Sequence, residues 1–122
     1  MFSNWKFVFL DRGDLYFPAG KPFDLRCQNK TGGNFLSVFW YSTAYTGNGR
    51  LRTDIYRYTI PENTYVSKLF KNRIERIKGT SLRISDSKLE DSGKWKCDII
   101  FVINGDLKVT TLASYNVHIV SK

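Results

Sequence analysis

The chain has 122 residues, the length of one compact domain and too short for two hydrophobic cores. Apolar residues make up 42% and charged residues 25%, which is typical of a globular protein and argues against disorder. Lys and Arg number 19 against 11 Asp and Glu, a net charge of +8, which favours acidic partners or simply solubility. No apolar run reaches the length of a membrane span. No linker, repeat or low-complexity tract divides the sequence, so we expect a single domain over residues 1–122.

Short strands separated by turns are expected along the whole chain. Aromatic residues make up 16% of it, and no segment sustains the three-four apolar spacing of a long helix. Turn signals recur at short intervals, as in a sandwich or barrel of antiparallel strands. The expected strands are 5–10 with a continuation near 15–17, then 23–29, 35–42, 55–60, 65–70, 73–77, 81–84, 94–103 and 107–120. Asn104-Gly105 suits a type I′ turn, and a break or bulge is expected near Ala113-Ser114.

Cys27 and Cys97 are the only cysteines and stand far apart in the chain. Neither belongs to a Cys-x-x-Cys pair and there is one histidine, so no zinc site is expected. A long-range disulfide is the expected state, which implies an oxidising, extracellular compartment. Chain-entropy arithmetic for a loop of this length gives a stabilisation of roughly 4 kcal/mol.

Catalytic chemistry has little support in the sequence. His118, the sole histidine, falls on the last expected strand, where a surface role is favoured over that of a base. No Gly-rich phosphate loop, paired-carboxylate constellation or nucleophile elbow is present. Basic residues mix with Tyr and Phe, but no RNA- or DNA-binding motif accompanies them. We therefore expect no enzyme activity, no cofactor and no nucleic-acid partner.

Three separated anchors resemble the signature of the immunoglobulin superfamily. They are Cys27, Trp40 thirteen residues later, and the run Leu-Glu-Asp-Ser-Gly-Lys-Trp-Lys-Cys that ends at Cys97, similar to the family's Asp-x-Gly-x-Tyr-x-Cys motif. The resemblance covers about residues 20–97 and implies an all-β fold, a two-sheet antiparallel sandwich with an inter-sheet disulfide packed against Trp40. About forty residues separate Trp40 from the strand at 81–84, which leaves room for two extra strands and implies the variable (V) type.

The resemblance also assigns roles near the second cysteine. Asp91 and Gly93 occupy their motif positions, and Arg73 is placed to pair with Asp91, as in V-type members. Trp95 stands where the family has its corner tyrosine, and Ser87 where an apolar residue is expected. The last strand lacks the Phe-Gly-x-Gly motif of rearranging antigen receptors. This argues against an antibody or T-cell-receptor chain and favours an adhesion or innate receptor ectodomain.

One face of the sandwich is the predicted partner-binding surface. Alternation from the inward Cys27, Trp40 and Cys97 predicts which side chains face outward on the GFCC′ sheet, formed by strands 107–120, 94–103, 35–42 and 55–60. The predicted partner-binding residues are Phe39, Tyr41, Tyr56, Tyr58, Lys96, Asp98, Ile100 and Val102. Apolar residues rimmed by charges, here including Arg57, are typical of a protein-binding surface. A covering neighbour or a one-residue register slip would reverse these assignments.

The loops form a second, less favoured candidate site. They are 30–34, 59–64 and the short turn at Asn104-Gly105, whose flanking strands are able to project together as a finger. Asn29-Lys30-Thr31 is the only N-glycosylation sequon, so Asn29 is a candidate glycan site beside the first of these loops.

The resemblance implies an extracellular recognition domain of a cell-surface receptor that binds itself or a related V-type domain through the GFCC′ face. The alternative is a basic module that binds polyanionic glycans or an acidic protein ligand. The densest basic run, which motivates it, is Lys68, Lys71, Arg73, Arg76, Lys78 and Arg83. No secretory signal is visible in residues 1–10, so we expect a mature or excised part of a longer protein, attached to a membrane only through segments outside it.

Overall fold

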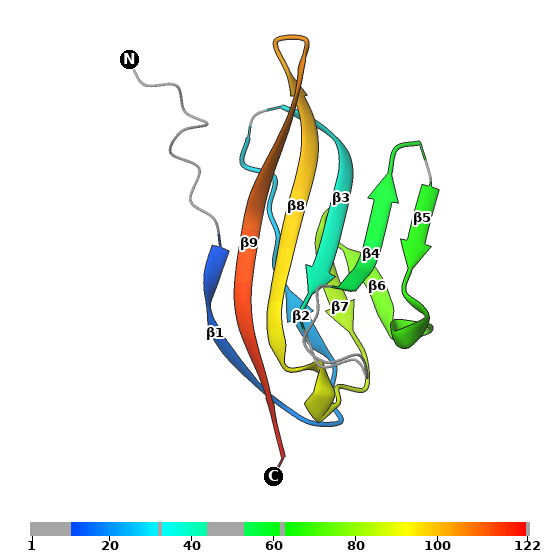
Figure 1. The fold of residues 1–122 in the computed structure, drawn as a ribbon, viewed down its shortest axis with the longest axis vertical. Helices are drawn as coiled ribbons and strands as arrows, with labels where there is room; N and C mark the ends of the chain where they lie inside the picture. The colour runs from blue at the N-terminus through cyan, green and yellow to red at the C-terminus, as the bar shows by residue number, and fades with distance from the viewer. Residues whose placement is uncertain (1–10, 32, 44–52, 62, 122) are drawn as a thin grey trace.

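The computed structural model describes residues 11–31, 33–43, 53–61 and 63–121, and in these ranges nine strands form two sheets packed face to face (Figure 1). The six-stranded sheet has the order β1-β9-β8-β3-β4-β5, and the three-stranded sheet has the order β2-β7-β6. The strand expected at 5–10 lies outside the described residues.

The strands of the six-stranded sheet are β1 (Asp11–Pro18), β9 (Asp106–Val120), β8 (Gly93–Ile103), β3 (Asn34–Ser42), β4 (Thr53–Thr59) and β5 (Asn63–Val66). The other sheet consists of β2 (Phe23–Leu25), β7 (Ser81–Ile84) and β6 (Ile74–Ile77), and two 3₁₀ turns, η2 (Lys68–Phe70) and η3 (Leu89–Asp91), complete the described elements. All paired strands are antiparallel except β1 and β9, so the expected antiparallel pattern fails only at this edge. These two strands come from distant parts of the chain, so no short connection dictates their direction.

β2 is shorter than the strand expected at 23–29. It ends at Leu25 because the side chains of Thr80 and Ser81, at the start of β7, form hydrogen bonds with the backbone of Cys27. The Cys27 amide donates to Ser81 Oγ at 2.9 Å, and the Thr80 hydroxyl donates to the Cys27 carbonyl. Side-chain bonds of this kind replace the ladder that would have continued the strand.

β5 is displaced from the strand expected at 65–70. It covers Asn63–Val66, and the following Lys68–Phe70 forms η2 instead. Ser67 caps this turn, since its hydroxyl accepts a hydrogen bond from the Leu69 amide at 3.3 Å. Serine competes with strand pairing in this way, and a β-rich run alone does not reveal it.

The core lies between the two sheets and contains the expected anchors. Cys27 and Cys97 form a disulfide, both cysteines are fully buried, and Trp40 is 1% exposed. The Trp40 indole N–H donates to the Thr80 carbonyl at 2.9 Å, a hydrogen bond across the core. Leu82 of β7 is also fully buried on the inner face.

The base of the sandwich is held by the motif residues around Asp91, which is 2% exposed. Its carboxylate pairs with the Arg73 guanidinium and accepts a hydrogen bond from the Lys88 amide at 2.9 Å. The Trp95 indole N–H donates to the Asp91 carbonyl at 2.8 Å, so it makes the backbone bond that a corner tyrosine makes from the same position. Gly93 has a φ of 149°, a backbone angle that residues with a side chain rarely adopt.

Ser87, which stands where an apolar residue is expected, is 3% exposed and has hydrogen-bonding partners. Its hydroxyl donates to the Pro18 carbonyl at 3.0 Å, and its own carbonyl accepts from the Gly20 amide at 2.8 Å. A hydroxyl is therefore favoured here because it ties the turn after β7 to the turn after β1.

β8 and β9 form a long hairpin that projects beyond β3 (Figure 1). Asn104 and Gly105 both have positive φ, 53° and 80°, as the predicted turn requires. Cys97 pairs with Ala113 while Asp98 pairs with Thr111, so the residue between them, at position 112, is a bulge. It lies one position before the expected irregularity and forms without glycine.

Candidate functional site

The outer face of the six-stranded sheet is the candidate site. Trp40 and Cys97 pair with each other and point into the core, so the residues that alternate with them point outward. The strand register gives this outward direction to six of the eight predicted partner-binding residues, and all six are half-buried. They are Phe39, Tyr41, Lys96, Asp98, Ile100 and Val102.

Tyr56 and Tyr58 do not belong to this face, and their predicted outward direction is wrong. Tyr56 pairs with Trp40 and Tyr58 pairs with Val38, whose side chains are buried in the core. Directly paired residues share a face of the sheet, so both tyrosines point inward, and Tyr56 is only 6% exposed. Arg57, between them, is the outward residue of β4.

An aromatic pocket lies at the β3–β4–β5 end of the outer face. Tyr65 pairs with Arg57, which pairs with Phe39, so the three side chains form one outward row. Tyr65 is 41% exposed, and the Arg57 guanidinium carbon lies 5.4 Å from its ring centroid, a cation–π contact. The pocket, of about 100 Å³, is lined by Phe39, Trp40, Asp54, Tyr56, Arg57 and Tyr65. Sequence reasoning missed Tyr65, although it expected a strand beginning there, because the predicted face did not include that strand.

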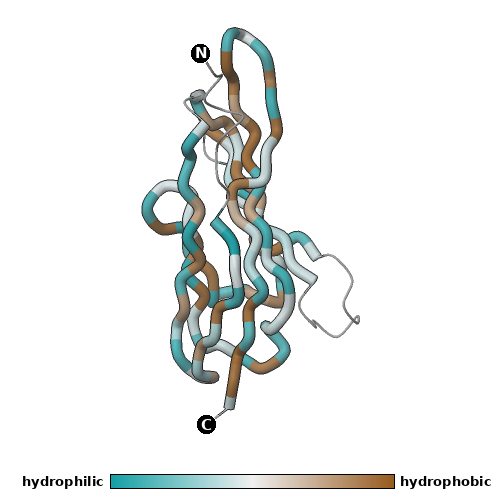
Figure 2. Tube along the Cα trace, turned by 90° about the vertical axis from the view of Figure 1, so that its left-hand side faces the viewer, coloured by the Kyte–Doolittle hydropathy of each residue, from teal (hydrophilic) through white to brown (hydrophobic). Residues whose placement is uncertain are grey.

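A second group on this face lies on the projecting hairpin. Val109 pairs with Ile100, Leu107 pairs with Val102, and Leu107 and Val109 are each 65% exposed. These four residues are called the hairpin strip, and Figure 2 shows hydrophobic residues continuing into the projecting hairpin. Without the bulge in β9, alternation from the buried Tyr115 would have placed Leu107 and Val109 inward, which is why the sequence did not reveal them.

No protein-family model matches the chain, and a search of curated proteins finds no match. Solved structures, in contrast, match most of its length. The V domain of amphioxus IgVJ-C2 matches with a TM-score of 0.68 at 14% identity, covering 86% of this chain and 98% of that one. Murine CRIg matches with a TM-score of 0.67 at 13% identity, covering 86% and 92%. The chain has the fold of an immunoglobulin V domain.

A third match is the extracellular domain of the voltage-gated sodium channel beta4 subunit, with a TM-score of 0.62 at 18% identity, covering 92% of this chain and 88% of that one. In V-domain terms, β3, β4 and β5 are strands C, C′ and C″, and β8 and β9 are strands F and G. The candidate surface is therefore the outer face of the GFCC′ sheet, extended by C″.

The BC loop of the V domain lies against the base of the hairpin. A Cβ at Gly33 would stand 2.5 Å from the Val102 carbonyl oxygen and 2.8 Å from the Phe101 ring, so this close approach requires glycine. Asn29 is exposed, its Oδ1 accepts from the Thr31 hydroxyl at 2.6 Å, and its amide donates to the Gly33 carbonyl at 3.2 Å. Glycosylation of Asn29 stays a prediction.

The basic run that motivated polyanion binding does not form one surface of the V domain. Arg73 is paired with the buried Asp91. Arg76 points between the sheets, where its guanidinium lies 3.8 Å from the Tyr58 ring centroid. Arg83 forms an ion pair across β2 and β7. Three of the six cations in that run are therefore engaged in separate places.

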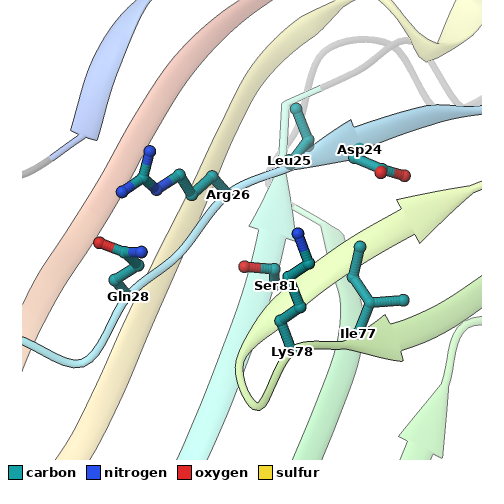
Figure 3. A pocket seen from close by; sticks show the side chains of 7 residues that line it. All are labelled: Asp24, Leu25, Arg26, Gln28, Ile77, Lys78 and Ser81. Carbon is teal, nitrogen blue, oxygen red and sulfur yellow. The ribbon is translucent and has the colours of Figure 1, made fainter.

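A hollow of about 400 Å³, with basic residues in its lining, lies at the opposite, three-stranded sheet (Figure 3). It is lined by Asp24, Leu25, Arg26, Gln28, Ile77, Lys78 and Ser81. Asp24 is held by Arg83 in a two-pronged ion pair at 2.8 and 3.0 Å, and these hydrogen bonds lower the pKa of Asp24. Arg26 and Lys78 bring two cations to this hollow.

His118 lies at the exposed β1–β9 edge of the V domain. Its Nε2 is 3.1 Å from an Asp14 carboxylate oxygen, and its ring stacks on Tyr16 with centroids 4.5 Å apart. Over the part of the chain that the structure describes, no three His, Cys, Asp or Glu side chains are grouped to hold a metal ion. Nor does any helix in that part have the length and apolarity to span a membrane.

Proposed function

We propose that this V domain is an extracellular recognition domain of a cell-surface protein, and that it binds another V-type domain through the outer GFCC′ face. The observation that carries the proposal is the apolar content of this face. Two aliphatic side chains of the hairpin strip are 65% exposed, and Phe39, Tyr41 and Tyr65 lie on the same face. Soluble monomers rarely expose contiguous apolar patches of this kind outside interaction sites.

The matched structures support pairing as a use of this fold. The report on the beta4 subunit describes parallel homodimers of its extracellular domain that explain a role in cell–cell adhesion. That property is beta4's own, and at 18% identity only the fold is shared. The buried Cys27–Cys97 disulfide adds support for an extracellular setting, because such bonds persist under oxidising conditions.

Apolar burial would drive this association and charges would orient it. Phe39 and Ile100 lie near the middle of the face, while Arg57, Lys96 and Asp98 present charges beside them. Charges at such positions contribute specificity more than affinity. We expect weak, transient pairing that gains strength from many copies on a surface.

Analytical ultracentrifugation of the wild type against Phe39→Asp and Ile100→Asp tests the proposal. We expect concentration-dependent association of the wild type and loss of association in both variants. Gln28→Asp, which adds the same charge to the opposite sheet, is the matched control and should associate like the wild type. A monomeric wild type that also fails to aggregate coated beads would contradict homophilic pairing.

The second candidate, binding of acidic glycans or an acidic ligand, is favoured by the basic hollow. Arg26→Gln combined with Lys78→Gln should lower the salt concentration that elutes the protein from heparin, because fewer counterions are released. The control pair is Lys21→Gln with Lys88→Gln, two exposed lysines outside the hollow. Equal elution of both double variants would remove this candidate.

A further inference from the structure

We infer that the partner of the outer face is a second copy of this chain, and that the hairpin strip of each copy enters the aromatic pocket of the other. This inference rests on the proposed function and names its partner and its contact. Three observations carry it: an exposed aliphatic strip, a pocket of matching size, and their placement at opposite corners of one face.

The inserting element is the hairpin strip. Leu107 pairs with Val102 and Val109 pairs with Ile100, at the level where β8 still pairs with the first residues of β3, and only the pair Ile103–Asp106 and the turn lie beyond that strand. Leu107 and Val109 are each 65% exposed and lie on a strand, not on a loop, so the sheet fixes their outward direction. An exposed aliphatic side chain that stands out from a sheet face can enter a hollow on a facing molecule.

The receiving element is the aromatic pocket. Its volume of about 100 Å³ is smaller than the roughly 150 Å³ cavity that admits a benzene molecule in an engineered core, so it suits one valine or leucine side chain. The outward rings of Phe39 and Tyr65 give it apolar walls, while Arg57 and Asp54 contribute charge to its lining. Aromatic walls with a charged residue beside them are typical of pockets that receive an apolar anchor.

The two elements are placed for exchange by two-fold symmetry. The pocket row contains Phe39 and Arg57, and Val109 lies three strands away from Arg57, about 14 Å at the usual strand spacing. Along the strands, Val109 is about 7 Å, or two residues, from the row of Phe39. A two-fold axis lying along the face, between Phe39 and Ile100, would exchange pocket and strip, so each contact forms twice.

Cysteine cross-linking tests this arrangement. One chain carries Val109→Cys, a second carries Arg57→Cys, and the two are mixed under mild oxidation. We expect the mixed disulfide to form at least tenfold faster than either self-linked dimer. Circular dichroism checks that both variants fold, which is expected because both positions are exposed.

The cross-linked product and the association of the wild type together show whether the contact or the partner is wrong. If the wild type associates but Val109→Cys links mainly to itself, the arrangement is wrong while pairing through the face stands. If the wild type does not associate with itself, the second copy is the wrong partner and this inference falls, whatever other V domain it binds.

Alanine variants supply an independent measurement. Leu107→Ala combined with Val109→Ala should raise the dimer Kd at least tenfold, because both anchors are truncated. Tyr16→Ala removes an aromatic side chain that is 66% exposed at the β1 edge, away from the strip and the pocket, and should change the Kd less than twofold. Equal effects of the two changes would overturn the inference.

Discussion

The two ends of the β8–β9 hairpin consist of similar residues in opposite surroundings. At the lower end, Trp95, Cys97 and Ile99 are fully buried between the sheets. At the upper end, beyond the bulge in β9, Leu107 and Val109 are 65% exposed. The same strand pair thus anchors the sandwich at one end and presents apolar surface at the other. Apolar content alone does not distinguish a core segment from an interface segment, because burial depends on whether the opposite sheet covers the segment.

The largest expected effect lies at the anchored end. Replacing both Cys27 and Cys97 by alanine should lower the free energy of unfolding by about 2–5 kcal/mol, because the unfolded chain regains the entropy that the long loop had lost. Urea denaturation followed by circular dichroism measures the change. A loss below about 1 kcal/mol would mean that packing around Trp40 holds the sheets together without the bridge.

Trp95→Phe should have the next largest effect, a loss of about 1–3 kcal/mol. The ring contacts with Phe23 and Phe70 can persist, but the buried Asp91 carbonyl loses its indole donor. Urea midpoints of wild type and variant give the difference. An unchanged midpoint would show that the bond to Asp91 does not act as the corner interaction that its position suggests.

Tyr115→Phe should cost about 1 kcal/mol at neutral pH, since the Tyr115 hydroxyl donates to the Arg26 carbonyl. Burial raises the pKa of Tyr115 from 10.0 to about 12. The unfolded state therefore releases this proton at lower pH than the folded state, and the associated stability is lost as pH rises from about 10 to about 12. The variant lacks this loss, so its difference from the wild type should narrow between pH 8 and pH 11. A constant difference would contradict the raised pKa.

The anchored end was predictable from the sequence, and the exposed end was predictable only in part. Cys27, Trp40 and the motif ending at Cys97 identify the core because their residue types and their spacing can be read directly from the chain. The outward direction of Phe39 and Ile100 followed from the same alternation. Bulges break that alternation, and they depend on cross-strand hydrogen bonds that no local pattern reveals.

The misassigned side chains show this dependence. Tyr56 was expected outward, but the register between β3 and β4 pairs it with Trp40 and turns it into the core. Leu107 and Val109 face outward only because the bulge reverses the parity of β9. Tyr65 belongs to the face because it pairs with the outward Arg57. Each error concerns pairing between strands, while β3 and β8, which contain Trp40 and Cys97, begin within one residue of their expected positions.

The smallest expected effect lies at the exposed end. Val109→Ser should change the free energy of unfolding by less than about 0.5 kcal/mol, because the side chain contributes little to the core. Ile99→Ala, on the buried side of the neighbouring strand, should cost about 2–5 kcal/mol. Thermal and urea unfolding of the two variants measure this contrast directly. If Val109→Ser were destabilising by more than 1 kcal/mol, the hairpin strip would be part of the core, and its exposure would no longer argue for a partner.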